Sequence, residues 1–185
     1  MLRTHLMAII GLLGAAILGC VPQLVSVDLA VPYDEKEMAH RLAPGNNEIH
    51  SRINFRRPFG GYANCIYGLV TLVPATPYAV AWISEFYGNP EIAWPIDKSA
   101  FMEKNGSFLV IRDTEPFFAA SRQTYCDSDS HFGFRNLADG DYFVMVNVLW
   151  RKWGSSATVG SLVTRFKVTG GEHLELKWPA LIDLE

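Results

Sequence analysis

The 185-residue sequence predicts a mainly β protein, an antiparallel β-sandwich of about seven strands with one short inserted helix. Apolar residues alternate along several short segments, and turns that contain glycine separate those segments. The clearest strand is residues 141–150, in which both sets of alternating positions carry large apolar side chains. One face of this strand would carry Tyr142, Val144, Val146, Val148 and Trp150, and the other Phe143, Met145, Asn147 and Leu149.

The remaining elements follow from the same patterns. The other expected strands are residues 49–55, 68–74, 107–112, 131–134, 158–168 and 173–178. The second of them ends at Pro74, which has no N–H to donate to a neighbouring strand. Thr76 and Pro77 are then typical of a helix start and Gly88 of a helix end, which predicts a helix inserted between strands.

The N-terminus has the pattern of a secretory signal that is cut in front of a cysteine. Leu6–Leu18 is an apolar run, shorter than the about 20 residues that a membrane-spanning helix needs, and Cys20 follows it directly after Gly19. We therefore expect residues 1–19 to be a lipoprotein signal peptide and Cys20 to carry palmitate or another acyl chain. An ordinary signal cut nearby, or a short buried helix with an incidental cysteine, remains the alternative.

The predicted anchor has consequences for location. The second residue of the mature chain would be Val21 rather than aspartate, and by resemblance to Gram-negative lipoproteins this implies the periplasmic side of the outer membrane. Residues 20–47 are punctuated by prolines and are expected to be a tether. Asp34 and Glu37 form a capping-box pattern for one short helix, which would be stable only if Met38 and Leu42 dock on the domain.

Two cysteines, Cys65 and Cys126, remain once Cys20 is acylated. An even pair in an exported domain predicts a disulfide. Closing a loop of about 60 residues would stabilise the fold by roughly 4 kcal/mol in the chain-entropy model. Two buried free thiols are the alternative, and the pair is too small for a structural zinc site.

Several classes of function are disfavoured by the sequence. The net charge of −3 and the lack of a concentrated basic segment argue against nucleic-acid binding. The histidines show no ligand spacing, and neither a phosphate loop nor a hydrolase elbow occurs, so we expect no enzyme, cofactor or metal. Asp127 and Asp129 suit calcium chemically, but a turn whose carboxylates bond their own backbone is favoured over an incomplete calcium site.

Two stretches together resemble the carboxypeptidase regulatory-like domains. They are Cys65-x-x-Gly-Leu-Val-Thr-Leu-Val-Pro-Ala-Thr-Pro-Tyr78 and Thr124-Tyr-Cys-Asp-Ser-Asp-Ser-His-Phe-Gly-Phe-Arg-Asn-Leu-x-x-Gly-Asp-Tyr142. The resemblance implies a non-catalytic transthyretin-like (prealbumin-like) β-sandwich over residues 48–179, followed by a C-terminal tail, 180–185. This sequence departs from the family pattern at Ala138-Asp139, where proline is frequent in the family. Tyr142 would bury its ring and fix a neighbouring connection through its hydroxyl, as in a tyrosine corner.

Two functions are compatible with this sequence. The first is a lipid-anchored scaffold that contacts an envelope protein partner through residues 89–123 and 150–157. The second is a carbohydrate-binding module that holds cell-surface glycan on loop aromatics, with Trp94, Trp150 and Trp153 as the candidate binding surface. Packing of most of these rings in the core is the alternative.

Overall fold

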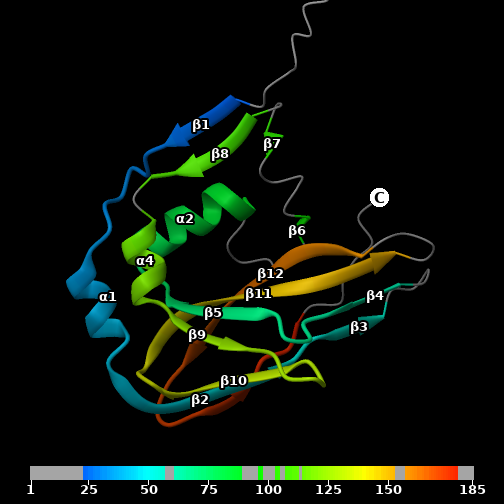
Figure 1. Cartoon of the computed structure of the whole chain (residues 1–185). Coiled ribbons are helices and arrows are strands. Elements are labelled where there is room, and N and C mark those ends of the chain that lie inside the picture. Colours follow the sequence, from blue (N-terminus) through cyan, green and yellow to red (C-terminus); the bar gives the residue numbers. More distant parts are fainter. Residues whose placement is uncertain are drawn as a thin grey trace, which may run out of the picture.

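The computed structural model describes residues 23–56, 61–88, 96–97, 103–104, 107–112, 114–152 and 157–178 (Figure 1). The protein is mainly β. A larger and a smaller sheet face each other, a third, short sheet lies at one end, and there are a few short helices. The described helices are α1 (Glu35–Arg41), α2 (Pro77–Tyr87) and α4 (Glu115–Ala120). In the described part of the chain, no helix is long and apolar enough to cross a membrane.

The larger sheet is built around β11 (Gly140–Lys152). β12 (Thr158–Val168) pairs with β11 in antiparallel register from Gly140–Val168 to Trp150–Thr158. On its other side, β11 pairs first with β5 (Leu69–Pro74) and then with β4 (Gly61–Asn64). The sheet is completed by β3 (Asn54–Arg56), β6 (Ile96–Asp97) and β9 (Arg122–Tyr125).

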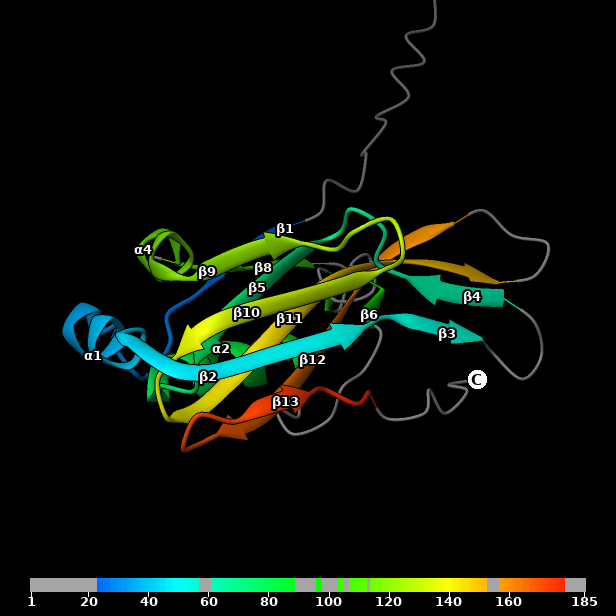
Figure 2. The ribbon, with the colours of Figure 1, turned by 90° about the horizontal axis from the view of Figure 1, so that it is seen from below.

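A smaller sheet packs on one face of the larger one. Its order is β10 (His131–Leu137), β2 (Pro44–Arg52) and β13 (His173–Glu175), and it lies in front of β11 and β12 in Figure 2. The core between the two sheets includes Ile49, Ile53, Val70, Leu72, Phe132, Phe134, Tyr142, Val144, Val146, Val148 and Leu162. Facing sheets that enclose one apolar core are the arrangement of a β-sandwich.

The opposite face of the larger sheet is partly covered by the helices. Phe143 and Met145 of β11 pack there with Trp82 and Ile83 of α2 and with Met38 of α1. The predicted alternation of residues 142–146 is therefore confirmed, because successive side chains of β11 enter two different cores.

Local capping signals predicted the first two helices correctly. The Asp34 carboxylate accepts hydrogen bonds from the N–H groups of Lys36 and Glu37 at the start of α1. The Thr76 hydroxyl accepts from the Ala79 N–H, and Gly88 ends α2 with a φ of 74°. α4 was not predicted, although Pro116 lies in its first turn and Phe117 is fully buried.

A third, short sheet differs from the antiparallel prediction. β1 (Gln23–Val27) pairs in parallel with β8 (Ser107–Ile111), and β8 pairs with β7 (Glu103–Lys104). β13 and β2 are also parallel. The described strands, β1 to β13, outnumber the seven expected, because short strands such as β1, β4 and β9 pair over long sequence separations that local patterns do not reveal.

Residues 23–47, where the sequence predicts a tether, contain β1, α1 and the first residues of β2. Leu29, Val31 and Tyr33 pack on the helix-side core, and Met38 is 1% exposed. Met38 and Leu42 both pack in this core, which meets the condition under which a stable helix was expected here. Burial of this segment therefore stabilises a short helix that would be marginal alone.

Tyr142 has the predicted tyrosine-corner arrangement. Its ring is buried and stacks on Phe166, and its hydroxyl lies 3.0 Å from the carbonyl oxygen of Ala138 and 3.1 Å from that of Arg41. Burial raises the pKa of Tyr142, so the hydroxyl is protonated and donates at neutral pH. One hydroxyl thus connects the β10–β11 turn to the end of α1.

Candidate binding surface

Three of the six sequence-predicted site residues lie outside the described part of the chain. Cys20, Trp94 and Trp153 belong to residues that the structure does not describe. Trp150 is placed by its backbone, which pairs with Ala63 of β4 and Thr158 of β12. The predicted tryptophan surface therefore lies outside the residues whose side chains the structure describes.

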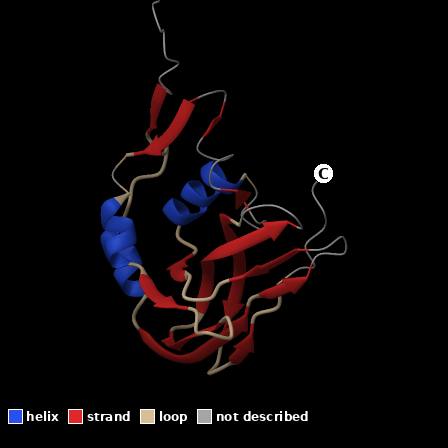
Figure 3. Cartoon of the chain, turned by 45° about the vertical axis from the view of Figure 1, so that its right-hand side comes forward, coloured by secondary structure: helices blue, strands red, loops and turns tan. Residues whose placement is uncertain are grey.

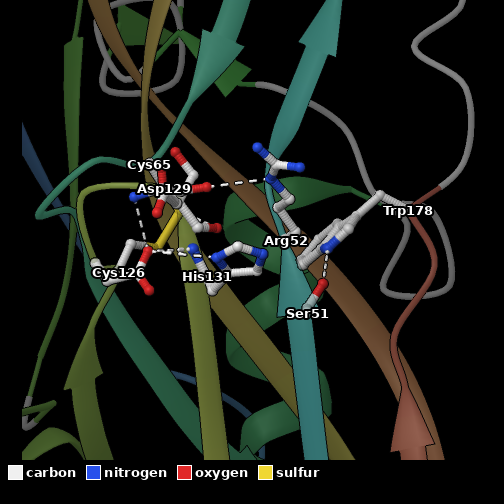
Figure 4. The surroundings of a disulfide bond; sticks show 9 residues. Ser51, Arg52, Cys65, Cys126, Asp129, His131 and Trp178 are labelled. Atoms are coloured by element: carbon white, nitrogen blue, oxygen red, sulfur yellow. Dashed lines mark hydrogen bonds and ion pairs between the residues drawn. A yellow bond between two sulfur atoms is a disulfide. The ribbon is translucent and has the colours of Figure 1, made fainter.

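The predicted disulfide is confirmed. Cys65 and Cys126 are bonded to each other, with a Cα–Cα distance of 5.8 Å, and each is 1% exposed (Figure 4). The bond joins the turn that precedes β5 to the end of β9. The Tyr67 N–H donates to the Cys126 carbonyl oxygen at 3.2 Å, and the Cys126 N–H donates to that of Gly68 at 3.0 Å. Three connections therefore hold this turn against β9.

Two tyrosines project from this clamped region. Tyr67 follows Cys65 by two positions and is 71% exposed, and Tyr125 directly precedes Cys126 and is 66% exposed. Tyr67 has a φ of 54°, the left-handed conformation that costs a non-glycine residue roughly 1 kcal/mol or more. Since Gly68 N–H also donates to the Cys65 carbonyl oxygen, the turn holds Tyr67 in this conformation.

Close packing of Gly68 against β11 also restrains the turn. A Cβ atom on Gly68 would lie 2.2 Å from the Asn147 carbonyl oxygen, so only glycine permits this approach of the turn to β11. The two exposed tyrosines therefore start from backbone positions that a disulfide, hydrogen bonds and close packing all restrain.

Beside the tyrosines, the larger sheet carries a face that α2 does not cover. Leu69 pairs with Tyr125, and by alternation both lie on the helix side of the sheet, two positions beyond the buried Thr71. Leu149 pairs with Asn64 on one side and with Val159 on the other. We call this surface the open face and define it by Tyr62, Asn64, Leu69, Tyr125, Asn147, Leu149 and Val159.

The open face combines exposed apolar groups with amide groups. Val159 is 51% exposed, Leu149 43% and Tyr62 39%. The Asn147 Oδ1 accepts from the Ser161 hydroxyl at 3.2 Å, which orients the amide of Asn147. The open face ends where Tyr87 of α2 is hydrogen-bonded to Ser161. The pKa of Tyr87 is raised, because the effect of burial exceeds the opposing effect of this hydrogen bond.

A separate groove lies on the outer face of the smaller sheet. It has a volume of about 500 Å³ and is lined by Glu48, Ile49, His50, Phe132, Gly133, Phe134 and Arg135. Gly133 pairs with His50, so the missing side chain leaves the hollow. Glu48 Oε2 lies 3.8 Å from the Arg135 Nε and 3.5 Å from the His173 Nδ1, and exposed pairs at such distances contribute little stability.

The Asp127–Ser130 segment forms a turn that bonds its own backbone. Asp127 Oδ1 accepts from the N–H groups of Asp129 at 2.9 Å and His131 at 2.8 Å. The bond from the His131 N–H is the main reason why the pKa of Asp127 is lowered. Figure 4 shows this turn beside the disulfide, where the Arg52 Nε donates to the Asp129 carbonyl oxygen. Within the described residues, no group of three or more His, Cys, Asp or Glu side chains is placed to hold a metal.

Tyr67 and Tyr125 were not among the binding residues predicted from the sequence, which were all tryptophans. A usable signal was present, because each tyrosine lies within two positions of a cysteine that was predicted to pair. Tyr62, Leu149 and Val159 had no such signal. Their common surface depends on the register of β4 and β12 on β11, which the sequence alone does not specify.

No protein-family model and no curated protein sequence matches this chain. Among solved structures, the chain is similar to the crystal structure of a "putative carbohydrate binding protein" from Pseudomonas aeruginosa. The TM-score is 0.60 at 19% sequence identity, and the match covers 80% of this chain and 97% of the other. At this identity the likeness concerns the fold.

Proposed function

We propose that this protein is a non-catalytic domain, anchored in the cell envelope by acylated Cys20, that binds carbohydrate on the open face and the adjoining Tyr67. The observation that carries the proposal is the pair of exposed tyrosines beside the disulfide. A sugar ring has an apolar face of C–H groups, and aromatic side chains with nearby polar groups are typical of small-ligand sites.

Rigidity supports this proposal. A ligand that binds a flexible loop must order it, whereas the turn at Tyr67 is already restrained by the Cys65–Cys126 bond and by backbone hydrogen bonds. Asn64 and Asn147 add half-buried side-chain amides to the same surface. Amide groups can both donate to and accept from the hydroxyl groups of a sugar.

The structural neighbour supports the same ligand class. The match covers 97% of the chain of that neighbour, which is described as a "putative carbohydrate binding protein". The proposal also retains the finer fold assignment, a transthyretin-like sandwich of the carboxypeptidase regulatory-like kind, in which the domain presents surfaces and carries no reaction centre.

Affinity electrophoresis tests the proposal. The wild type is run in gels that contain, in turn, soluble peptidoglycan, lipopolysaccharide, mannan and glucans, and retardation by at least one is expected. Tyr125→Ala and Tyr67→Ala should each weaken that binding about fivefold to tenfold, which corresponds to about 1 to 1.4 kcal/mol. Tyr125→Phe should bind nearly as well, because it keeps the ring.

His173→Ala is the matched control, since His173 is also exposed but lies on the smaller sheet. Absence of retardation on every polysaccharide would contradict carbohydrate binding. Normal retardation of both tyrosine-to-alanine variants would place the ligand elsewhere.

A scaffold that binds an envelope protein is the second candidate, favoured by one observation. Leu149 and Val159 face each other across β11 and β12, and both are exposed, as in the apolar centre of a protein interface. Cross-linking in intact membranes, followed by mass spectrometry, should then recover one stoichiometric partner, and Leu149→Lys should abolish its recovery. Recovery of no partner by the wild type would exclude this candidate.

The anchor is tested separately. Labelled palmitate should enter the wild type and not Cys20→Ser, and only the wild type should sediment with membranes. Incorporation of label into both proteins, or into neither, would contradict acylation at Cys20.

A further inference from the structure

Residues 23–47, which precede most of the sandwich, are folded into the body of the molecule. All five residues of β1 pair with β8, and the Arg112 N–H donates to the Val27 carbonyl oxygen beyond the last pair. Tyr33 contacts the rings of Tyr78 and Phe117 on the helix-side core. Residues 23–47 therefore cannot extend as a spacer without losing these contacts.

The remaining linker is very short. Only Val21 and Pro22 stand between Cys20 and Gln23, the first residue of β1. Three Cα–Cα steps span at most about 11 Å, whereas an extended tether from residue 20 to residue 48 would span about 95 Å. An acyl group on Cys20 would thus hold β1 close to the bilayer surface.

From this geometry we infer that the β1–β8–β7 sheet is the membrane-contacting end of the protein, with a lipid bilayer surface as its partner. The inference rests on the proposed acylation of Cys20. Val25 of β1 and Val110 of β8 are 40% and 41% exposed, and because Val110 pairs with Ser26 they lie on opposite faces of this sheet. Each face therefore offers an apolar side chain for contact with the boundary between lipid headgroups and acyl chains. Figure 3 shows the helices between this sheet and the sandwich.

This placement also orients the two surfaces described above. In Figure 1, β1, β8 and α2 lie above the larger sheet, and β2 and β10 lie below it. The open face belongs to the upper, helix side of that sheet. It is therefore turned toward the membrane, and the groove of the smaller sheet is turned away from it. A ligand on the open face would lie between the domain and the bilayer.

Energy transfer to a labelled bilayer tests the orientation. The chain from Cys20, which contains every residue that the structure describes, is coupled through its one free thiol to a maleimide lipid in phosphatidylcholine vesicles that carry a rhodamine lipid. A donor dye is attached by azide–alkyne chemistry to an unnatural residue at Val110 or at Glu175, both of which are exposed. Chemical coupling makes this test independent of whether cells acylate Cys20.

The matched control carries a long Gly-Ser spacer between Pro22 and Gln23. The donor at 110 should transfer more efficiently than the donor at 175, and the spacer should abolish the difference, because it releases the sheet from the bilayer. Equal transfer from both positions without the spacer, or greater transfer from 175, would overturn the inference. If the difference is found but palmitate does not label Cys20 in cells, the orientation holds for the coupled chain and the proposed anchor is wrong.

Discussion

At the scale of single residues, Asn47 is a buried polar group whose side chain makes four hydrogen bonds within the described residues. Its side-chain amide donates to the Leu137 carbonyl oxygen and to Asp139 Oδ1, and its Oδ1 accepts from the N–H groups of Gly171 and Glu172. Asn47 is fully buried, so each of these bonds replaces one that water would make. One side chain thus joins β2 to the turns that follow β10 and β12.

Asp139 makes the stability of this junction depend on pH. The hydrogen bond from Asn47, followed by that from the Gly170 N–H, lowers the pKa of Asp139. A folded-state pKa below the unfolded one adds stability above the unfolded value, near pH 4, and that stability is lost as the pH falls through the folded pKa. Urea midpoints of the wild type should therefore fall on acidification more steeply than those of Asp139→Asn.

The comparison should show a reduced slope in Asp139→Asn rather than a flat line, because the pKa of Asp127 is lowered in the same direction. Identical pH profiles for the two proteins would show that the Asp139 charge does not stabilise the junction.

Tyr142→Phe tests the tyrosine corner. The variant keeps the ring on Phe166 but leaves the carbonyl oxygens of Ala138 and Arg41 without the hydroxyl. We expect a loss of about 1 to 2 kcal/mol in the free energy of unfolding, measured with urea. Tyr125→Phe, at an exposed ring, should change stability by less than about 0.5 kcal/mol. Equal effects of the two substitutions would contradict a structural role for the Tyr142 hydroxyl.

At the scale of elements, the sequence predicted those that depend on neighbouring residues and missed those that depend on partners distant in the sequence. α2 was predicted because Thr76, Pro77 and Gly88 act on their own neighbours. The β1–β8 pair was not, since it joins Gln23 to Ser107 in parallel and no turn signal marks such a partner. The candidate surface shows the same contrast. Tyr67 and Tyr125 could be located from the neighbouring cysteines, whereas placing Leu149 and Val159 required the register of β4 and β12 on β11.

The disulfide should matter for both stability and binding. Replacing Cys65 and Cys126 together by alanine frees the turn at Tyr67 from β9, and we expect a loss of roughly 4 kcal/mol in the free energy of unfolding. If the open face binds glycan, the double variant that remains folded should also bind it more weakly than the wild type, because the turn must be ordered on binding. Unchanged stability would show that the bond does not restrain the unfolded chain.

At the scale of the whole molecule, residues 23–47 and the sandwich should behave as one folded unit. Lys36 and Arg41 are trypsin sites that would be cut quickly in an unfolded tether. In the structure they lie in α1, whose Met38 is buried against the larger sheet. Limited trypsin digestion of the native protein, followed by mass spectrometry, should leave both bonds intact after exposed termini are removed.

Met38→Lys provides the contrast, because a charge cannot be buried at that site without a partner. The variant should release α1, and cleavage after Lys36 and Arg41 should then precede cleavage within the sandwich. Rapid cleavage of the wild type at these positions would contradict the docking of α1.

The central position of β11 also restricts how the length of this sequence can vary. Even-numbered residues 142–148 fill the core between the sheets, whereas Phe143 and Met145 fill the core under the helices. Inserting or deleting one residue within 142–148 would exchange these two sets and place tyrosine and valines beneath α2. Insertions and deletions should therefore be tolerated in related sequences only outside this stretch, while conservative changes of side-chain size within it remain open to selection.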